Sequence, residues 1–201
     1  MIKLIEKIIL KIKKPKIVIV VEDSQSYITD FIFLIINNYF KVRKTKGTLS
    51  FSDILFGKLI LINSDIKEIE SYNYLLKNSK ESVLVFAGTD KKNYENNIEI
   101  PLNFKFLLFN SDAITISNFE KDNFSEVYSF GFSKKSDFQG TDMKINDDTN
   151  FKINFQGNII PFWLKGKNDE KKVSAVLAGI ALGKMLDLNL VNISKKIKEL
   201  S

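Results

Sequence analysis

The sequence contains no cysteine and no histidine among its 201 residues. Without cysteine, disulfides, thiolate metal sites and cysteine nucleophiles are all excluded. Without histidine, the chain lacks both the usual general base near neutral pH and the commonest ligand for transition metals. A Ser-His-Asp triad and a typical zinc site are therefore impossible. Any chemistry must come from Asp, Glu, Lys, Arg, Tyr, Ser or Thr side chains, or from the backbone.

Long apolar runs are also lacking. No stretch approaches the roughly 20 apolar residues that a membrane-spanning helix needs. Lysines interrupt the apolar stretch at the start of the chain, and no small-residue cleavage site follows it, which argues against a secretory leader. We therefore expect a cytoplasmic protein. With 44% hydrophobic and 27% charged residues the chain can bury a core, so residues 1–201 are expected to form a single domain.

Residues 1–14, MIKLIEKIILKIKK, have the spacing of an amphipathic helix, and lysines occupy its polar side. Its apolar side is formed by Ile2, Ile5, Ile9 and Ile12. Pro15 ends the helix, because proline cannot continue the backbone hydrogen-bond pattern. Two interpretations stay open. The helix packs on its own domain or on a neighbouring one, or it lies on a membrane surface.

Continuous apolar runs then alternate with helical patterns. The predicted strands cover residues 17–21, 41–43, 59–62, 82–87, 106–109 and 126–132, and the predicted helices cover 28–40 and 66–76. Apolar strands separated by helices indicate a parallel sheet that is covered on both faces. The predicted fold class is therefore α/β, with three layers and a mostly parallel sheet.

The last part of the chain has a different pattern. Three short antiparallel strands are expected, over 144–145, 151–155 and 159–164. The turn Gln156-Gly157-Asn158 suits a tight hairpin between the last two. Two helices are expected to follow, over 173–186 and 193–200, with Asn192 as the N-cap of the second. The sheet should thus end in a small antiparallel section, followed by a C-terminal helical pair.

Several stretches, in their order along the chain, resemble those of one known family. They are KKPKIVIVVEDSQSYITDFI from Lys13, LLFNSDAIT from Leu107, VYSFGFSKKSDFQGTDMKI from Val127 and VSAVLAGIALGKMLDLNLVNISKKIKEL from Val173. Together they resemble the central domain of the Mur ligases, the ATP-dependent amino-acid ligases of peptidoglycan precursor synthesis. The type that adds D-alanyl-D-alanine to the UDP-MurNAc-tripeptide is the most similar. The resemblance covers about Lys13 to Leu200. It implies a P-loop-type sheet whose carboxyl edge faces a nucleotide.

The chain departs from this family at the phosphate loop, which has the form T-G-S-x-G-K-T-T-T-K. In the alignment, the first glycine falls on Glu22 and the second on Gln25. The lysine falls on Ser26, and the metal-binding threonine falls on Tyr27. Glu22 and Asp23 put two carboxylates where a triphosphate would lie, and like charges a few ångströms apart repel. The resemblance thus implies a degenerate phosphate loop formed by Asp23, Ser24, Gln25, Ser26 and Tyr27.

Other positions of the family's nucleotide site are partly retained. Asn63 stands near the place of a glutamate that helps to hold Mg²⁺, with Asp65 two residues further on. Asn110 and Asp112 follow a core strand, where the resemblance implies contacts on the ribose side of the nucleotide. Asp112 is either such a contact or an ordinary turn residue. We expect no catalytic residue, no metal site and no bound cofactor, unless other residues rebuild a site for ATP and Mg²⁺.

Two functions from different classes are compatible with these residues. In the first, the chain is a non-catalytic Mur-ligase-like domain that acts by binding or scaffolding in peptidoglycan precursor synthesis. In the second, it is a subunit of an ATP-dependent amino-acid ligase, and another chain supplies the N- and C-terminal ligase domains. The loss of the loop glycines and lysine favours the first, because phosphoryl transfer depends on positioned charge. A weak contact of residues 1–14 with the inner membrane face is an accessory expectation. No nucleic acid is expected, because no binding motif is present.

Overall fold

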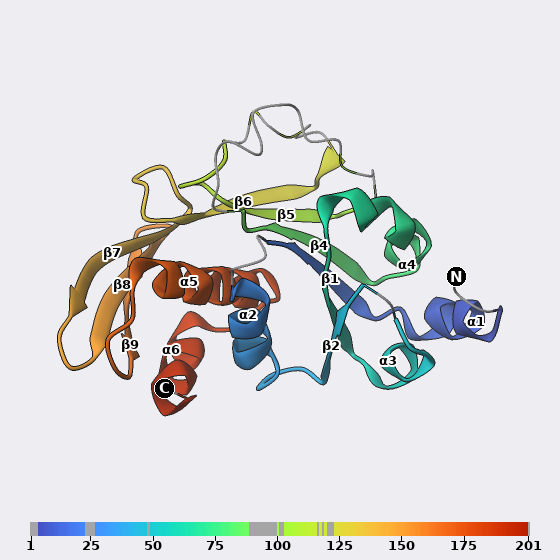
Figure 1. Cartoon of the computed structure of the whole chain (residues 1–201), viewed down its shortest axis with the longest axis horizontal. Coiled ribbons are helices and arrows are strands. Elements are labelled where there is room, and N and C mark those ends of the chain that lie inside the picture. The colour runs from blue at the N-terminus through green and yellow to red at the C-terminus, as the bar shows by residue number, and fades with distance from the viewer. Residues whose placement is uncertain are drawn as a thin grey trace.

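The computed structural model describes residues 4–22, 27–47, 49–88, 100, 103–115, 117, 119 and 123–200, apart from the side chain of Leu200. Within these residues, nine strands form one continuous sheet (Figure 1). The strands are β1 (Lys16–Val21), β2 (Val42–Lys46), β3 (Leu59–Asn63), β4 (Glu81–Phe86), β5 (Phe106–Asn110), β6 (Glu126–Gly131), β7 (Phe138–Ile145), β8 (Thr149–Phe155) and β9 (Asn158–Leu164).

The sheet has the strand order β2-β3-β1-β4-β5-β6-β7-β8-β9. Neighbouring strands from β2 to β6 run parallel. β7 joins β6 in parallel through two residue pairs, and β7, β8 and β9 are antiparallel neighbours. The predicted α/β fold with a mostly parallel sheet and a small antiparallel section is therefore confirmed. All carboxyl ends of the parallel strands lie at one edge of the sheet.

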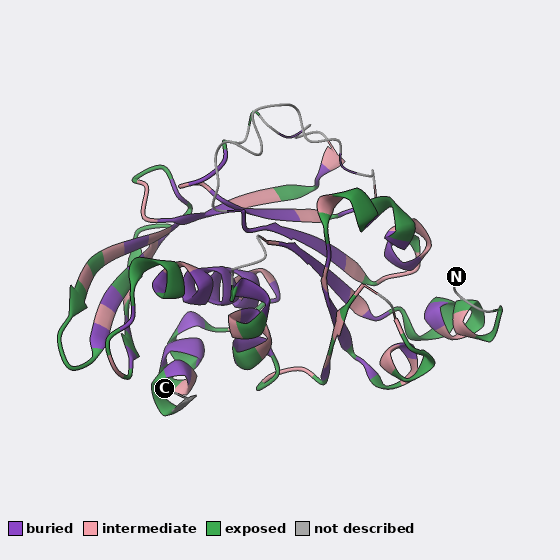
Figure 2. Cartoon of the chain, in the orientation of Figure 1, coloured by how far each residue is buried: buried purple, intermediate pink, exposed green. Residues whose placement is uncertain are grey.

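Alternating side chains of the central strand β1 fill two separate cores. Val18 and Val20 face one side of the sheet, whereas Ile17 and Ile19 face the other, and all four are fully buried. The first side is covered by α2 (Ile28–Ile36), α5 (Glu170–Met185) and α6 (Leu190–Leu200). The second side is covered by α1 (Leu4–Lys13), α3 (Phe51–Phe56), the 3₁₀ helix η1 (Ile66–Tyr72) and α4 (Asn73–Lys77). Figure 2 shows the central parallel strands β1, β4 and β5 largely buried between these two helical layers.

The C-terminal helical pair packs closely because α5 is rich in small residues. Residues 175–183 of α5 are all buried. A Cβ atom at Gly179 would lie 2.6 Å from Cδ1 of Ile35 on α2, and one at Gly183 would lie 2.8 Å from Cδ1 of Ile193 on α6. The two glycines therefore let α2 and α6 approach α5 at a distance that larger side chains would prevent.

Several helix and strand boundaries differ from the expectations. The helix predicted over 28–40 ends at Ile36, and residues 37–39 form a turn. The helix predicted over 66–76 is the 3₁₀ helix η1 followed by α4. Asn192 is not the N-cap of the last helix. Instead, Oδ1 of Asn189 accepts hydrogen bonds from the backbone N–H groups of Val191 at 2.9 Å and Asn192 at 3.2 Å. No helix in the described part of the chain is both long and apolar enough to cross a membrane.

Two elements have no clear signal in the sequence pattern. α3 is too short to show an apolar period, although Ser50 and Asp53 form a capping box at its start. β7 begins at Phe138 rather than Lys144, and its exposed polar positions hide the strand. The hairpin turn between β8 and β9 agrees with the prediction. Gln156 and Gly157 have φ angles of 50° and 80°, as the favoured tight hairpin turn requires.

Candidate functional site

Four of the polar residues singled out in the sequence lie at the carboxyl edge of the sheet. Glu22 follows β1, Asn63 ends β3, and Asn110 and Asp112 lie at the end of β5. The strand order places β3 beside β1, and β4 between β1 and β5. Open parallel sheets bind ligands just outside these strand ends. This edge is therefore the candidate site.

The carboxylate of Glu22 is held by two neighbouring elements. Its Oε2 accepts a hydrogen bond from the backbone N–H of Thr29 at 3.0 Å, and its Oε1 accepts one from the side-chain amide of Asn63. The same amide also donates to the hydroxyl of Thr29 at 3.1 Å. Thr29 is buried, and the other two residues are half-buried. These three residues form the Glu22 cluster, which joins the end of β1, the first turn of α2 and the end of β3.

The start of α2 is a place that favours an anion. Thr29 lies in the first turn of the helix, where backbone N–H groups have no partner within the helix. The helix dipole also favours negative charge at this end. The same two features bind phosphate groups in nucleotide-binding proteins. A carboxylate of the chain itself thus occupies part of a helix start of the type that binds phosphate.

The predicted degenerate loop is described only at its end, because Asp23, Ser24, Gln25 and Ser26 lie outside the described residues. Tyr27 occupies the N-cap position of α2 and is 59% exposed. Its side chain makes no capping hydrogen bond to the helix. Ser, Thr, Asn or Asp at this position would supply an acceptor to the first turn. Here the Glu22 carboxylate supplies one from the preceding strand end.

Asn110 and Asp112 belong to a second group, at the ends of β5 and β6. Oδ2 of Asp112 accepts the backbone N–H of Phe132 at 2.7 Å, and Oδ1 accepts that of Ser133 at 2.9 Å. The side-chain oxygen of the buried Asn110 accepts the N–H of Asp112 at 3.0 Å. These four residues form the Asp112 cluster. They tie the end of β5 to the loop that follows β6.

Gly131, the last residue of β6, leaves room for this contact. It has a φ angle of +151°, and a Cβ atom there would lie 2.6 Å from Oδ2 of Asp112. Glycine adopts such a conformation without steric cost. A second carboxylate fixes the same loop, because Oδ2 of Asp137 accepts the N–H of Ser129 at 2.8 Å and its hydroxyl at 2.7 Å. The loop after β6 is therefore held at both of its ends.

The structure thus brings Glu22, Asn63, Asn110 and Asp112 to one edge but into two groups. β4 lies between them, and at about 4.8 Å per strand the ends of β1 and β5 are roughly 10 Å apart. Asp65 joins neither group. Its carboxylate accepts the N–H of Lys67 at 2.9 Å and caps η1.

The described carboxylates and tyrosines are the candidates for metal and acid–base chemistry. Among the described residues, no three or more Asp and Glu side chains are grouped so that they could hold a metal ion. Burial is the main cause that raises the pKa of Tyr72, whose hydroxyl donates to the carbonyl of Gly47 at 2.8 Å. Burial also raises the pKa of Tyr39 and of Tyr128. These three tyrosines therefore stay protonated at neutral pH and are not poised as bases.

A separate apolar pocket of about 300 Å³ lies between α2, α5 and α6. Phe31, Ile35 and Val176 are among its apolar walls, and Lys165 and Lys172 are its charged residues. Its volume is at the small end of the range for ligand pockets. It is lined by no residue of the Glu22 or Asp112 clusters, so it is distinct from the carboxyl edge.

Comparison with known proteins gives no match from the sequence, either to a family model or to a curated protein. Solved structures do match. The MurF ligase from Thermotoga maritima in complex with ADP has a TM-score of 0.66 at 11% identity, over 94% of this chain and 51% of that chain. A UDP-N-acetylmuramoyl-L-alanyl-D-glutamate–2,6-diaminopimelate ligase has a TM-score of 0.67 at 9% identity, over 97% and 51% of the two chains. The chain has the fold of the Mur ligase central domain.

A third neighbour, the UDP-N-acetylmuramate-alanine ligase MurC from Thermotoga maritima, has a TM-score of 0.59 at 16% identity, over 96% of this chain and 47% of that chain. The chain therefore spans about half the length of the Mur ligases that it resembles. Ligases with different substrates in their names match with similar scores. The closer resemblance to the D-alanyl-D-alanine-adding type thus stays a prediction.

Sequence reasoning found the edge but missed the partners within each cluster. Thr29 reads as an ordinary helix residue. The hydrogen bond from its backbone N–H to Glu22 depends on where the helix starts. From the sequence, Asn63 reads only as a replacement for a metal-binding glutamate. Glu22 directly follows a strand and lies six residues before a helix start that has no capping side chain. A carboxylate in such a position is the signal that could have indicated the Glu22 cluster. No comparable signal in the sequence indicates the Phe132 and Ser133 amides.

Proposed function

We propose that this chain is a Mur-ligase-like domain that works by binding or scaffolding in peptidoglycan precursor synthesis and carries out no phosphoryl transfer of its own. The observation that supports this most strongly is the hydrogen bond from the N–H of Thr29 to the carboxylate of Glu22 at 3.0 Å. A helix start whose N–H group already donates to a carboxylate of its own chain is a poor binding site for a phosphate.

The electrostatics of this position support the proposal. A phosphate bound at the start of α2 would lie a few ångströms from the Glu22 carboxylate. Two like unit charges 4 Å apart repel by about 4 kcal/mol at an effective dielectric constant of 20. Residues 22–27, EDSQSY, contain no lysine or arginine that would offset this repulsion. ATP would also have to displace the hydrogen bonds that Glu22 accepts from Thr29 and Asn63.

One observation favours the alternative, an ATP-dependent ligase subunit completed by another chain. Each carboxylate oxygen of Asp112 accepts one backbone N–H, and each has a further lone pair. A ribose hydroxyl could therefore bind Asp112 without breaking the Asp112 cluster. A structural neighbour was solved with ADP, so a nucleotide is the natural ligand to test.

A protein partner and a location belong to both proposals. The chain spans about half the length of the ligases that it resembles. We propose a partner that carries the N- and C-terminal ligase domains, and a cytoplasmic site of action. The finer assignment to the D-alanyl-D-alanine-adding type rests on the stretches quoted above.

A loop-restored variant separates the two functions. Glu22→Gly, Gln25→Gly and Ser26→Lys together return the two glycines and the lysine of the family's phosphate loop. Thermal unfolding is measured for this variant and for the unaltered chain, with and without ADP and Mg²⁺. A ligand that binds only the folded state raises the unfolding midpoint. We expect the midpoint of the variant to rise with millimolar ADP, while that of the unaltered chain stays constant.

Asp187→Asn is the matched control for the lost carboxylate. Asp187 is exposed and has a φ angle of 66°, a conformation that Asn adopts readily. This variant should respond to ADP as the unaltered chain does. A nucleotide-dependent rise in the midpoint of the unaltered chain would contradict the scaffolding function and favour the ligase subunit.

A further inference from the structure

α1 packs on its own domain and still leaves an apolar stripe exposed. Leu10 is its fully buried residue, and the helix contacts α3. On the opposite side of the helix, four apolar side chains are exposed: Leu4 (75%), Ile5 (63%), Ile8 (52%) and Ile12 (76%). Positions 4, 8 and 12 form one row, because residues four apart share a helix face. Contiguous exposed apolar residues of this kind mark binding surfaces.

A row of lysines follows the amino edge of the sheet, next to α1. A lysine stands immediately before β2, β3, β4 and β5, and Lys14 stands two residues before β1. The five exposed residues of this row are Lys14, Lys41, Lys58, Lys80 and Lys105. The first residues of β2, β3, β1 and β4 lie at one level in the parallel register, because Val42 and Lys16 both pair with Leu59, and Lys16 also pairs with Glu81. Lys41, Lys58 and Lys80 each directly precede one of these strands, so they also lie at one level. Neighbouring strands are about 4.8 Å apart.

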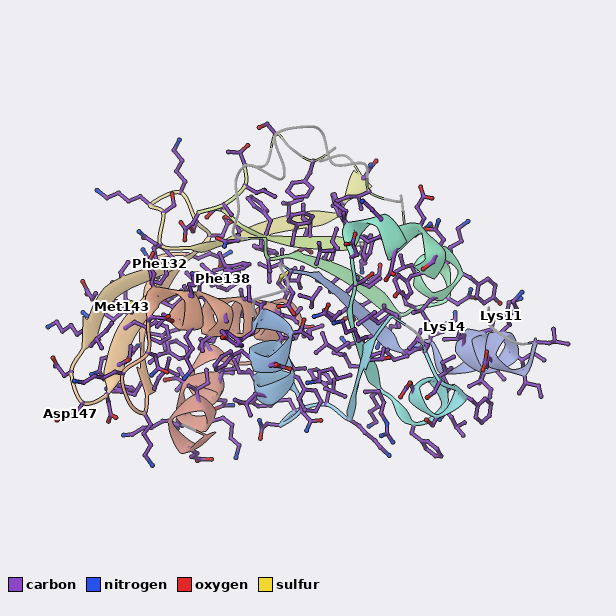
Figure 3. All side chains as sticks on the ribbon, in the orientation of Figure 1. Lys11, Lys14, Phe132, Phe138, Met143 and Asp147 are labelled. Atoms are coloured by element: carbon purple, nitrogen blue, oxygen red, sulfur yellow. The ribbon has the colours of Figure 1, made fainter. Side chains whose placement is uncertain are left out.

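Some carboxylates lie near this row, among them Glu199, which acts electrostatically on Tyr39 two residues before Lys41. Glu81, on the same edge, forms an ion pair with Lys16. Glu126 begins β6, and Glu6 is half-buried on α1. α1 adds further lysines to the same end of the molecule: Lys7, Lys11 and Lys13. Figure 3 labels Lys11 and Lys14 beside α1, at the end of the molecule opposite Asp147 in the turn between β7 and β8. The exposed stripe of α1 and the lysine row together form the amino-edge surface.

We propose that the amino-edge surface binds an anionic lipid bilayer, with α1 in the headgroup region and the lysine row against the lipid phosphates. Leu and Ile side chains on the stripe match the boundary of the acyl chains, and the lysines match the anionic headgroups. A helix as short as α1 anchors weakly by itself, so the lysine row supplies a necessary second contribution. A second copy of the chain would bring the same positive surface face to face with this one, and like charges would oppose that contact.

This contact gives the protein one orientation on the membrane. The amino edge of a parallel sheet is opposite its carboxyl edge, and α1 leads directly into the amino end of β1. With the amino edge on the bilayer, the Glu22 and Asp112 clusters face away from it. The carboxyl edge therefore stays accessible to a protein partner while the chain is bound.

Vesicle sedimentation tests the proposal with the full chain. Binding is compared between vesicles of phosphatidylcholine and vesicles of phosphatidylcholine mixed with phosphatidylglycerol. We expect binding to the anionic vesicles alone, weakened by added salt. Ile8→Ser with Ile12→Ser should lower the partition coefficient by at least about tenfold, because two exposed apolar side chains no longer enter the bilayer. Lys58→Gln with Lys80→Gln should lower it roughly fivefold for each lysine removed.

Matched controls carry the same substitutions elsewhere. Ile159→Ser with Val191→Ser alters two apolar residues that are 63% and 48% exposed on β9 and α6. Lys134→Gln with Lys135→Gln removes two exposed charges from the loop after β6. Both controls should bind like the unaltered chain. The proposal is overturned if the unaltered chain ignores anionic vesicles, or if the controls lose as much binding as the test variants. The unaltered chain could instead form a dimer and bind no vesicles. If Ile8→Ser with Ile12→Ser abolishes that dimer, the stripe is an interface with a second copy of the chain.

Discussion

At the scale of single residues, Glu22 accepts hydrogen bonds from Thr29, seven residues away, and from Asn63, 41 residues away. Its position in the alignment already indicated that a glycine of the phosphate loop is replaced by a carboxylate. Its partners could not be predicted in the same way. Asn63 reaches it because β3 pairs with β1 and places Asn63 opposite Val20, and Thr29 reaches it because α2 begins at Ile28. Both facts belong to the sheet register and the helix start, which a pattern of residue types does not specify.

The role of Glu22 in the free chain gives a stability prediction. Glu22→Ala removes the acceptor of the Thr29 N–H and of the Asn63 amide. We expect the free energy of unfolding to fall by about 1–2 kcal/mol, as for a lost helix cap with a buried partner. Urea denaturation followed by circular dichroism measures the change. Glu22→Gln keeps an acceptor oxygen and should lose less.

Asp187→Asn again serves as the control, since an exposed substitution away from such contacts changes stability by no more than about 0.5 kcal/mol. If Glu22→Ala is as stable as Asp187→Asn, the Glu22 cluster contributes nothing to the fold. The carboxylate would then be free to move away for a phosphate.

At the scale of helices and strands, the sequence predicts best where one pattern dominates. β1, β3, β4 and β5 are buried on both faces, so their sequences are continuous apolar runs. The helix predicted over 66–76 begins as the 3₁₀ helix η1, whose apolar residues Ile66, Ile69 and Tyr72 are spaced by three. That spacing matches the three residues per turn of a 3₁₀ helix. β7 was missed at its start because its outer positions are polar.

The contact between α2 and α5 gives a prediction at this scale. Gly179→Val would place a branched side chain where even a Cβ atom meets Cδ1 of Ile35 at 2.6 Å. Overpacking of this kind costs roughly 1–3 kcal/mol, and thermal unfolding measures it as a lower midpoint. Ser174→Val, at a half-buried position of the same helix, controls for the helix propensity of valine. Equal midpoints for the two variants would mean that α2 and α5 can move apart without cost.

At the scale of the whole molecule, the two edges of the parallel sheet carry different chemistry. The carboxyl edge carries the Glu22 and Asp112 clusters, in which the carboxylates bind backbone and amide groups of the chain itself. The amino edge carries the exposed lysines and lies beside the apolar stripe of α1. The strand order that creates both edges was predictable only as a class, because apolar runs indicate a parallel sheet without specifying which strands are neighbours. The Mur-ligase-like arrangement was accessible through the resemblance of ordered stretches.

We propose that the carboxyl edge of this fold does not accept a nucleotide phosphate. Calorimetric titration of the unaltered chain with ATP and with ADP, each with Mg²⁺, tests it most directly. We expect no binding heat up to millimolar nucleotide, because Glu22 holds the start of α2 and no lysine of residues 22–27 replaces the one that is missing. Binding of either nucleotide with a micromolar dissociation constant would contradict this proposal and favour a subunit of an ATP-dependent ligase.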